Sequence, residues 1–422
     1  MKKILIISPH YPPSNLAAVH RSRLFAQHLP SFGWNPIILT VDEKYYEEEL
    51  DWNLYQMLPP NQQITKVGAY PVTKPRLIGD IGLRAFYQLR KKALEIVKAQ
   101  KIDFVYIPIP SFYTALIGPY LHQRTGVKFG IDYIDPWVHR FPGSERIFSR
   151  HWWSTQFAKF LEPKALKGVS LITGVAEGYY TGVLKRNSYL SKTCLFGAMP
   201  YGGEQKDHTG LQNLEINSYL FKKNKKLQFV YAGAMLPKAY QPLEELFKAI
   251  STKAELFKNV EFHFIGTGSL SNDDQSYTIR PLAIKYNIWE SIVFEYPKRI
   301  PYLDVLIHLN DADAVFILGS TEPHYTPSKT YQAVLSQKPI WAILHEKSSA
   351  SKILTTTKAG VVLNINGVEG LKNIAQNIDS SFHEFLQFQK SYESEQVDLE
   401  TFNEFSAKKV TEKLVDLLNK II

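Results

Sequence analysis

The residues of this chain best suited to chemistry lie close together in the segment "TEPHYTPSKTYQAVLSQKP", positions 321–339. Thr326 is a suitable helix cap and Pro327 a suitable first helical residue, so we expect a helix to begin there. The amides of Ser328 and Lys329 would then be unpaired donors at the positive end of that helix. Backbone amides beside a lysine ammonium are groups that bind a phosphate.

Gln332 lies nearly one turn deeper in the same helix, about 60° around its axis from Lys329. Its amide can form hydrogen bonds with the two hydroxyl groups of a vicinal diol. We therefore expect this segment to bind a phosphate and a diol together. A capped surface helix with an exposed lysine is the alternative that the segment alone leaves open.

Short apolar runs that alternate with amphipathic helices must position this segment. Runs such as "ILIIS" near the start and "DAVFILG" just before the segment are typical of parallel strands buried on both faces. The alternation predicts doubly wound α/β structure, in which ligands bind beyond the carboxyl ends of the strands. Glu322 and Lys329 then belong to a loop at the ligand-binding edge of a sheet.

The alternation occurs twice, with a polar, glycine-containing connection between the two halves. We predict a Rossmann-like domain at residues 1–200, a linker at 201–225 and a second Rossmann-like domain at 226–400. Residues 401–422 form an amphipathic helix, which we expect to cross back onto the first domain. The predicted fold class is therefore α/β, with two doubly wound domains that face a central cleft.

The composition excludes several classes of protein. Apolar residues make up 45% of the 422 residues, which is enough to form two cores and argues against global disorder. The single cysteine, Cys194, excludes an intramolecular disulfide and a cysteine-rich metal site. The start "MKKILIISPHYPP" lacks the apolar core of a signal peptide, and no apolar run is long enough to span a bilayer. We expect a cytoplasmic protein.

The net charge of +9 originates in the first half of the chain. Residues 1–200 contain 25 Lys and Arg against 14 Asp and Glu, whereas residues 201–422 contain 24 against 26. The segments "KPRLIGDIGLRAFYQLRKKALEIVK" and "RFPGSERIFSRHWWSTQFAKFLEPKALK" interleave cations with aromatic residues, which favours a peripheral contact with an anionic membrane. Ordinary solvated helices are the alternative. Nucleic acid is not expected as a partner, because no nucleic-acid motif accompanies the charge.

Seven segments, in the correct order, resemble GT-B glycosyltransferases of the family-4 type. "PSKTYQAVLSQKPIWA" resembles the signature "PSKxYExLAxGKPxxA", whose helix binds the donor nucleotide, and "DYIDPWV" resembles the "RDxW" segment of bacterial surface-polysaccharide members. "FVYAGAMLPKAYQPLEELFKAI" and "FHFIGTGS" resemble the two donor-side loops of the second domain. The resemblance covers nearly the whole chain. It implies the GT-B fold and transfer of a sugar from a nucleotide-sugar, with retention of the anomeric configuration.

The resemblance implies a donor site in the second domain. Lys238 matches the basic residue that meets the leaving diphosphate, and Gly233 before it permits a close backbone approach. Gly266 lies in a segment similar to a nucleotide loop. Lys238, Lys329 and the first-turn amides of the helix would stabilise the charge on the departing diphosphate. The family has a pair of glutamates in an "E-x7-E" pattern, and the first of them would fall at position 324. Glu322 lies two residues before that position.

The resemblance also implies roles in the first domain. Asp135, at the end of a strand in "DYIDPWV", would orient or deprotonate the acceptor, although Asp before Pro is also an ordinary turn former. Ser14 and Asn15 occupy the place where the family's glycine loop approaches the donor. Arg21 and its neighbour His20, at the start of the first long helix, are candidates for contact with the donor phosphate or the acceptor.

Several positions depart from the family pattern. The ribose-binding glutamate is replaced by Gln332, and the first glutamate of the pair by His324. The glycine pair of the first loop is replaced by "SNLAA", and Gln337 stands where a glycine is usual. An amide still bonds a diol, but a charge-assisted bond becomes a neutral one that is weaker by roughly half.

The sequence thus predicts a glycosyltransferase that moves a sugar from a UDP- or GDP-sugar to a lipid-linked or cell-surface glycan. No metal or other cofactor is expected, because in enzymes of this type cationic side chains and a helix dipole stabilise the charge of the leaving diphosphate. The expected location is the cytoplasm, at the inner face of the cytoplasmic membrane. Two alternatives remain: a nucleotide-sugar epimerase of the same fold, and a non-catalytic nucleotide- or glycan-binding protein, which Gln332 and His324 would suit.

Overall fold

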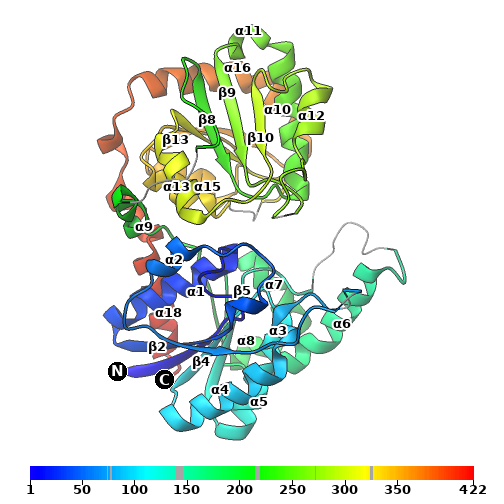
Figure 1. Ribbon diagram of the computed structural model, residues 1–422, viewed down its shortest axis with the longest axis vertical. Helices are drawn as coiled ribbons and strands as arrows, with labels where there is room; N and C mark the ends of the chain where they lie inside the picture. Colours follow the sequence, from blue (N-terminus) through cyan, green and yellow to red (C-terminus); the bar gives the residue numbers. More distant parts are fainter. Residues whose placement is uncertain (74, 77, 139–145, 214–218, 271, 324–326) are drawn as a thin grey trace. The chain divides into compact units, whose positions relative to one another are not determined.

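The computed structural model describes residues 1–73, 75–76, 78–138, 146–213, 219–270, 272–323 and 327–422. The described residues form two compact units. Unit 1 comprises Met1–Tyr201 together with Ala407–Ile422, and unit 2 comprises Gly202–Ser406. Each unit is a parallel sheet covered by helices (Figure 1). The predicted linker, residues 201–225, belongs to unit 2 from Gly202 onward.

Unit 1 contains a seven-stranded sheet in the order β3-β2-β1-β4-β5-β6-β7. Its strands are β1 (Lys2–Ile7), β2 (Trp34–Val41), β3 (Gln63–Val67), β4 (Phe104–Ile109), β5 (Lys128–Tyr133), β6 (Leu171–Gly174) and β7 (Leu195–Ala198). All the pairings are parallel, and Ile4 of β1 lies opposite Pro36 of β2 and Phe104 of β4. The chain order reverses between β1 and β4, which is the switch point of a doubly wound sheet.

The helices of unit 1 connect these strands. They are α1 (Ala17–His28), η1 (Leu29–Phe32), η2 (Glu43–Tyr45), α2 (Trp52–Gln56), α3 (Ile81–Arg84), α4 (Phe86–Gln100), η3 (Phe112–Leu116), α5 (Ile117–Thr125), α6 (Arg150–Ala165), α7 (Glu177–Arg186), α8 (Leu190–Thr193) and α18 (Ala407–Asn419). No helix in the described ranges is both long enough and apolar enough to cross a bilayer.

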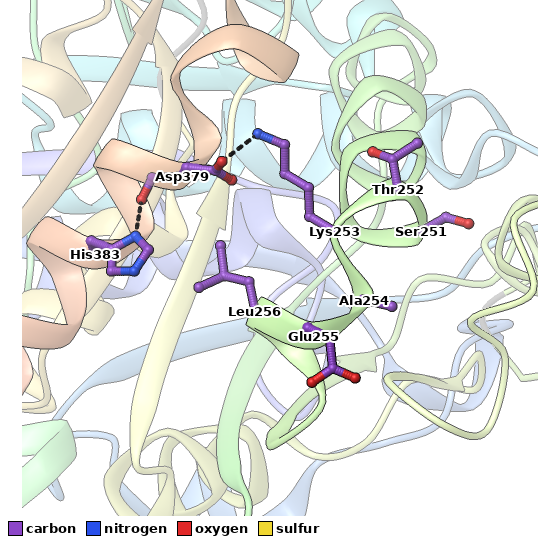
Figure 2. A pocket seen from close by; sticks show the side chains of 8 residues that line it. All are labelled: Ser251, Thr252, Lys253, Ala254, Glu255, Leu256, Asp379 and His383. Carbon is purple, nitrogen blue, oxygen red and sulfur yellow. Dashed lines mark hydrogen bonds and ion pairs between the residues drawn. The ribbon is translucent and has the colours of Figure 1, made fainter.

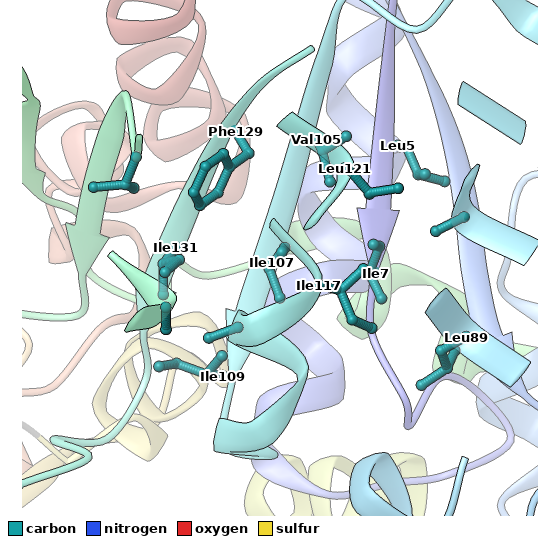
Figure 3. Packing of buried hydrophobic residues seen from close by; sticks show 14 of the residues in the cluster. Leu5, Ile7, Leu89, Val105, Ile107, Ile109, Ile117, Leu121, Phe129 and Ile131 are labelled. Atoms are coloured by element: carbon teal, nitrogen blue, oxygen red, sulfur yellow. The ribbon is translucent and has the colours of Figure 1, made fainter. Parts of the chain in front are cut away.

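Alternate residues of the central strands of unit 1, β1 and β4 among them, enter different cores. Leu5 and Ile7 of β1 belong to one core (Figure 3). The same core contains Leu89 of α4, Leu121 of α5 and Phe129 of β5. The intervening side chains of β1 belong to a second cluster, which includes residues of α1 and α18. Successive side chains of a strand point to opposite faces of the sheet, so a continuous apolar run is what a sheet covered on both faces requires.

The last helix, α18, belongs to unit 1 although it is far from the rest of the unit in sequence. Val410, Leu414 and Leu418 recur every four residues and are buried in the second cluster of unit 1. This spacing places them on one face of the helix. Lys2 Nζ donates a hydrogen bond to Asn419 Oδ1, 3.1 Å away, so both ends of the chain contribute to unit 1.

Unit 2 repeats the same strand order on six strands, β10-β9-β8-β11-β12-β13. The strands are β8 (Leu227–Ala232), β9 (Val260–Ile265), β10 (Val293–Tyr296), β11 (Ala314–Leu318), β12 (Ile340–His345) and β13 (Gly360–Ile365). The first strand of the unit, β8, again lies at the switch point, between β9 and β11. The predicted α/β class, with two doubly wound sheets, is confirmed.

The helices of unit 2 follow the strands in turn. They are α9 (Gln205–Thr209), η4 (Gly210–Asn213), η5 (Pro237–Ala239), α10 (Tyr240–Thr252), α11 (Ala254–Phe257), α12 (Arg280–Lys285), α13 (Tyr302–Asp311), α14 (Lys329–Leu335), α15 (Ser349–Thr356), η6 (Glu369–Leu371), α16 (Lys372–Lys390), η7 (Ser394–Gln396), α17 (Leu399–Phe402) and η8 (Asn403–Phe405). The segment with the candidate chemistry therefore lies between β11 and α14.

Candidate functional site

Two glycine turns follow adjacent strands of unit 2. The amide of Gly233, after β8, donates to the carbonyl of Ile265, and the amide of Gly266, after β9, donates to the carbonyl of Tyr296, both at 2.8 Å. Their φ angles of 109° and 68° lie in the region that glycine adopts without steric cost. The chain thus turns sharply at the carboxyl edge of the sheet, beside the loop that follows β11.

Lys329 reaches back from the start of α14 to the turn after β8. Its ammonium nitrogen lies 3.7 Å from the centroid of the Tyr231 ring. A β-carbon added at Gly233 would stand 3.2 Å from the same nitrogen. A side chain at position 233 would crowd this ammonium and would strain a backbone whose φ is 109°. Two segments about a hundred residues apart thus meet at one cation.

The ammonium of Lys329 is buried and lacks a hydrogen-bond partner within the described ranges, although the residue as a whole is partly exposed. Burial lowers the pKa of Lys329 from its ordinary value to about 7, because the charged form has lost solvent without gaining a counter-ion. A contact with an aromatic face compensates only in part. An anion at this position would supply the missing hydrogen bonds and charge.

A second cation lies in a neighbouring loop of unit 2. Lys238 of η5 forms an ion pair with Glu322, which follows β11; Nζ and Oε1 are 2.7 Å apart. The amide of Glu322 donates to Ser320 Oγ at 3.2 Å. Both members of the ion pair are partly exposed, so the contact contributes little to stability and can exchange for another partner.

The start of α14 differs in detail from the prediction. The helix begins at Lys329, and the half-exposed Ser328 occupies the position before it without a capping bond from its side chain. The amide of Thr330 donates to the carbonyl of Pro327 at 3.0 Å. The predicted cap Thr326 and the departure at His324 lie outside the described residues.

Gln332 contacts a histidine that the sequence analysis did not single out. Its Oε1 lies 2.8 Å from Nε2 of His208, and Nδ1 of that ring lies 3.2 Å from Oδ1 of Asn310. His208 belongs to α9, in the segment predicted as a linker, and burial lowers its pKa. No motif in the sequence could have shown that this segment docks against α13 and α14.

In unit 1, Asp135 lies just after β5. Its side chain is exposed at the surface, yet crowding by surrounding protein raises the pKa of its carboxyl toward about 6. A carboxylate of raised pKa is suited to accept a proton near neutral pH.

Arg21 of α1 is buried and fully engaged by its own unit. Its guanidinium donates to both carboxylate oxygens of Asp132, at 2.5 and 2.9 Å, and to the carbonyls of Met199 and Pro200, at 2.8 and 2.9 Å. Asp132 also accepts a hydrogen bond from Thr173 at 2.7 Å. These contacts give Arg21 a structural task, which is to hold the last residues of the main segment of unit 1 against the sheet.

The loop after β1 forms a polar cluster that the sequence analysis missed. Ser14 Oγ donates to Glu48, and Nδ1 of His10 lies 2.9 Å from the same carboxylate oxygen. Burial opposes ionisation of Glu48, but these hydrogen bonds outweigh it and lower the pKa of Glu48 to about 2. Ser14 is therefore occupied by Glu48, while Asn15 is half-buried between this cluster and α1.

An open pocket of about 440 Å³ lies elsewhere in unit 2, where the turn between α10 and α11 meets α16. Figure 2 shows its lining side chains, including Lys253 and His383. The ammonium of Lys253 pairs with Asp379 at 2.6 Å, so this cation has a counter-ion, whereas Lys329 has none among the described residues. None of the predicted site residues lines this pocket. Across the described residues, no three His, Cys, Asp or Glu side chains gather as a metal site.

No family model matches the sequence, and no curated protein matches it. Solved structures do. A glycosyltransferase from Rickettsia africae is 17% identical with a TM-score of 0.61, and the match covers 100% of this chain and 98% of that one. The sucrose-phosphate synthase of Thermosynechococcus elongatus is 14% identical with a TM-score of 0.62, covering 100% and 99%.

A third similar structure is HepE of Anabaena in complex with UDP-glucose. It is 12% identical with a TM-score of 0.60, and the match covers 100% of both chains. At such identities the likeness establishes the fold, and the fold is that of the GT-B proteins. The predicted fold is thereby confirmed over the whole length of the chain.

Proposed function

We propose that this protein is a glycosyltransferase that binds the diphosphate of a nucleotide-sugar at the carboxyl edge of the sheet in unit 2. The fold supports the proposal, because the similar structures include a glycosyltransferase, a sucrose-phosphate synthase and a protein solved with UDP-glucose. Assignment to the family-4 type within this fold stays a prediction.

The observation that carries the proposal is the buried ammonium of Lys329 beside Gly233, which has no hydrogen-bond partner among the described residues. An unpaired buried charge is costly, and a protein retains one where a ligand completes it. The position also matters, since Lys329 lies at the switch point of a doubly wound sheet, where such folds bind ligands. A diphosphate supplies the negative charge and the acceptor oxygens that this cation lacks.

Two further groups complete the proposed donor site. Lys238 would exchange Glu322 for a phosphate oxygen, so that the two lysines together stabilise the charge that develops on the leaving diphosphate. The turns at Gly233 and Gly266 and the amide of Ser328 would let the backbone approach the nucleotide closely.

Gln332 is proposed to bind the ribose diol through its amide nitrogen. His208 already lies against the amide oxygen, which leaves the NH₂ group as the part of Gln332 available to a ligand. A hydroxyl group can accept that hydrogen bond. His208 would thus fix the orientation of the amide, and this contact would replace the charge-assisted bond of a carboxylate at the same position.

The acceptor and the stereochemistry belong to the same proposal. The acceptor is a lipid-linked or cell-surface glycan on the cytoplasmic side of the membrane, and the reaction retains the anomeric configuration, as the resemblance of the sequence implies. Asp135 of unit 1 would orient the acceptor hydroxyl or take its proton, for which a raised carboxyl pKa is suitable.

Thermal denaturation in the presence of UDP, GDP or ADP tests the donor site, because a ligand that binds only the folded state raises the melting temperature. We expect one of these nucleotides to stabilise the wild-type protein and to leave Lys329→Met unchanged. Equal shifts in both proteins would refute the assignment of the site. With that nucleotide as a sugar donor, release of free nucleoside diphosphate only when a glycan acceptor is added supports transfer. Conversion of the nucleotide-sugar into its epimer without any acceptor supports the epimerase alternative.

A further inference from the structure

The outer face of α6 carries an aromatic stripe. Trp153, Phe157 and Phe160 are spaced four and three residues apart, so they share one side of the helix. Their exposed fractions are 47%, 55% and 61%. Phe148, which precedes the helix and is 73% exposed, packs against Trp152 and Trp153 with ring centroids 5.5 and 6.2 Å away. We name Ile147 and these five aromatic residues the α6 surface.

Another face of the same helix anchors it to unit 1. Ala158 and Ala165 are buried in the core, and the carboxylate of Glu162 accepts two hydrogen bonds from Arg186, each at 2.8 Å. The helix is therefore already held without its aromatic stripe. Large exposed aromatic groups that the core does not need indicate a contact with a partner.

Among the described residues 146–170, every exposed charge around the α6 surface is positive; Glu145, the residue before them, lies outside the described residues. Exposed cations precede, flank and follow the stripe: Arg146, Arg150, Lys159, Lys164 and Lys167. Lys164 Nζ lies 3.6 Å from the centroid of the Phe160 ring, so one cation borders the stripe directly. From position 146 to 170 the single carboxylate is that of Glu162, which is buried and paired with Arg186. The exposed side of α6 thus offers rings and cations without any carboxylate.

We propose that the α6 surface docks this protein onto a membrane of anionic phospholipids. Aromatic rings favour the headgroup region of a bilayer, and neighbouring lysine and arginine side chains are attracted to anionic headgroups. A helix that binds this way lies in the plane of the interface with its aromatic side inward. A helix whose exposed charges in the described residues are all positive fits a flat anionic surface better than it fits a protein groove. The proposal does not depend on the donor site in unit 2.

Co-sedimentation of the full-length protein with phospholipid vesicles tests the proposal. We compare phosphatidylcholine vesicles with vesicles that also contain about 30% phosphatidylglycerol. The wild-type protein is expected to bind the anionic vesicles at least about tenfold more tightly, and most of that preference should disappear at about 0.5 M salt, where charges are screened within about 4 Å.

Two variants separate the contributions of the rings and the charges. The triple variant Trp153→Ser/Phe157→Ser/Phe160→Ser should lose vesicle binding by about tenfold or more, since interfacial aromatic burial is removed. Arg146→Gln/Arg150→Gln/Lys164→Gln should lose the preference for anionic lipid. Trp52→Ser is the matched control, because Trp52 is also in unit 1 and 50% exposed but lies outside the α6 surface; it should bind like the wild type.

Unchanged melting temperatures would show that these variants fold, as expected for exposed positions. Lipids brominated in their acyl chains should quench tryptophan fluorescence in the wild-type protein and less in Trp152→Phe/Trp153→Phe. The proposal is overturned if the wild-type protein binds neither kind of vesicle, or if the triple variant binds as tightly as the wild type. It is also overturned if the α6 surface instead mediates self-association, seen as a dimer that the triple variant loses in sedimentation velocity.

Discussion

The ammonium of Lys329 lies 3.7 Å from the centroid of the Tyr231 ring and, within the part of the chain that the structure describes, donates no hydrogen bond. The ring faces a cation whose pKa has fallen to about 7 because it is buried. The folded protein therefore carries an unfavourable charge that a ligand can neutralise. Stability and ligand binding should respond in opposite directions when this lysine is changed.

Lys329→Met is expected to stabilise the free protein and to abolish its response to nucleoside diphosphate. Methionine fills similar space without a charge, so the unfolding free energy at neutral pH should rise by about 2 kcal/mol. Urea denaturation with and without the diphosphate measures both effects. Lys238→Met is the matched control for the stability effect. Lys238 is exposed, so its loss should change the free energy of unfolding by less than about 1 kcal/mol. A destabilised Lys329→Met protein would contradict the prediction.

The stability advantage of Lys329→Met should depend on pH. The pKa of Lys329 is about 7 in the folded protein and 10.5 in an ordinary environment. Between these values the unfolded chain binds more protons than the folded one, so the wild-type protein gains stability relative to the variant as pH rises. Below pH 7 the difference should be largest and constant, and near pH 10.5 it should vanish. Thermal denaturation of both proteins from pH 6 to 10 measures it; a difference independent of pH would argue against the lowered pKa.

At saturating concentrations, nucleoside diphosphate should remove the pH dependence of the wild-type protein's stability near neutral pH. An anion in contact with Lys329 favours the protonated form and moves its pKa back toward the ordinary value. The affinity for diphosphate should correspondingly weaken as pH rises above about 7, the pKa in the free protein. Calorimetric titrations in buffers of different ionisation enthalpy would detect the proton that is taken up on binding.

The pair of Lys238 and Glu322 should limit how strongly Lys238 binds an anion. Glu322→Gln removes the competing carboxylate, 2.7 Å away, and is expected to tighten pyrophosphate binding by about twofold to fivefold. Lys238→Ala should weaken binding and lower turnover by about a hundredfold or more. In the double variant Glu322→Gln should have no further effect, because its benefit acts through Lys238. Tightening of similar size in the presence and absence of Lys238 would show that Glu322 repels the anion directly.

The periodicity of the sequence was sufficient to predict the two sheets, because buried parallel strands and amphipathic helices leave local patterns. It also located Lys329 and Gly233 in strand-end loops. The contact between Lys329 and Tyr231 is not local, since it depends on which strands become neighbours after folding. The contact of His208 with Gln332 is of the same kind, because α9 carries no motif and docks through tertiary packing.

Arg21 illustrates how an exposed-looking motif residue can become structural. In the sequence it stands at the start of a helix after a polar loop, where a phosphate contact is reasonable. Its buried partner Asp132 lies 111 positions later, at the end of another strand, and no local pattern links the two. The ion pair depends on the fold, which brings α1 and β5 together within unit 1.

Arg21→Met is expected to destabilise the protein without altering the donor site. It leaves the carboxylate of Asp132 buried without its cationic partner, and breaking a buried ion pair from one side costs about 3–5 kcal/mol. Removing both charges in Arg21→Met/Asp132→Leu should recover part of this loss, because no uncompensated charge remains. Urea denaturation measures these differences, and nucleotide titration of the folded fraction tests the site in unit 2, whose affinity should be unchanged. If Arg21→Met instead kept its stability and lost nucleotide binding, Arg21 would be a donor ligand and its pairing with Asp132 incidental.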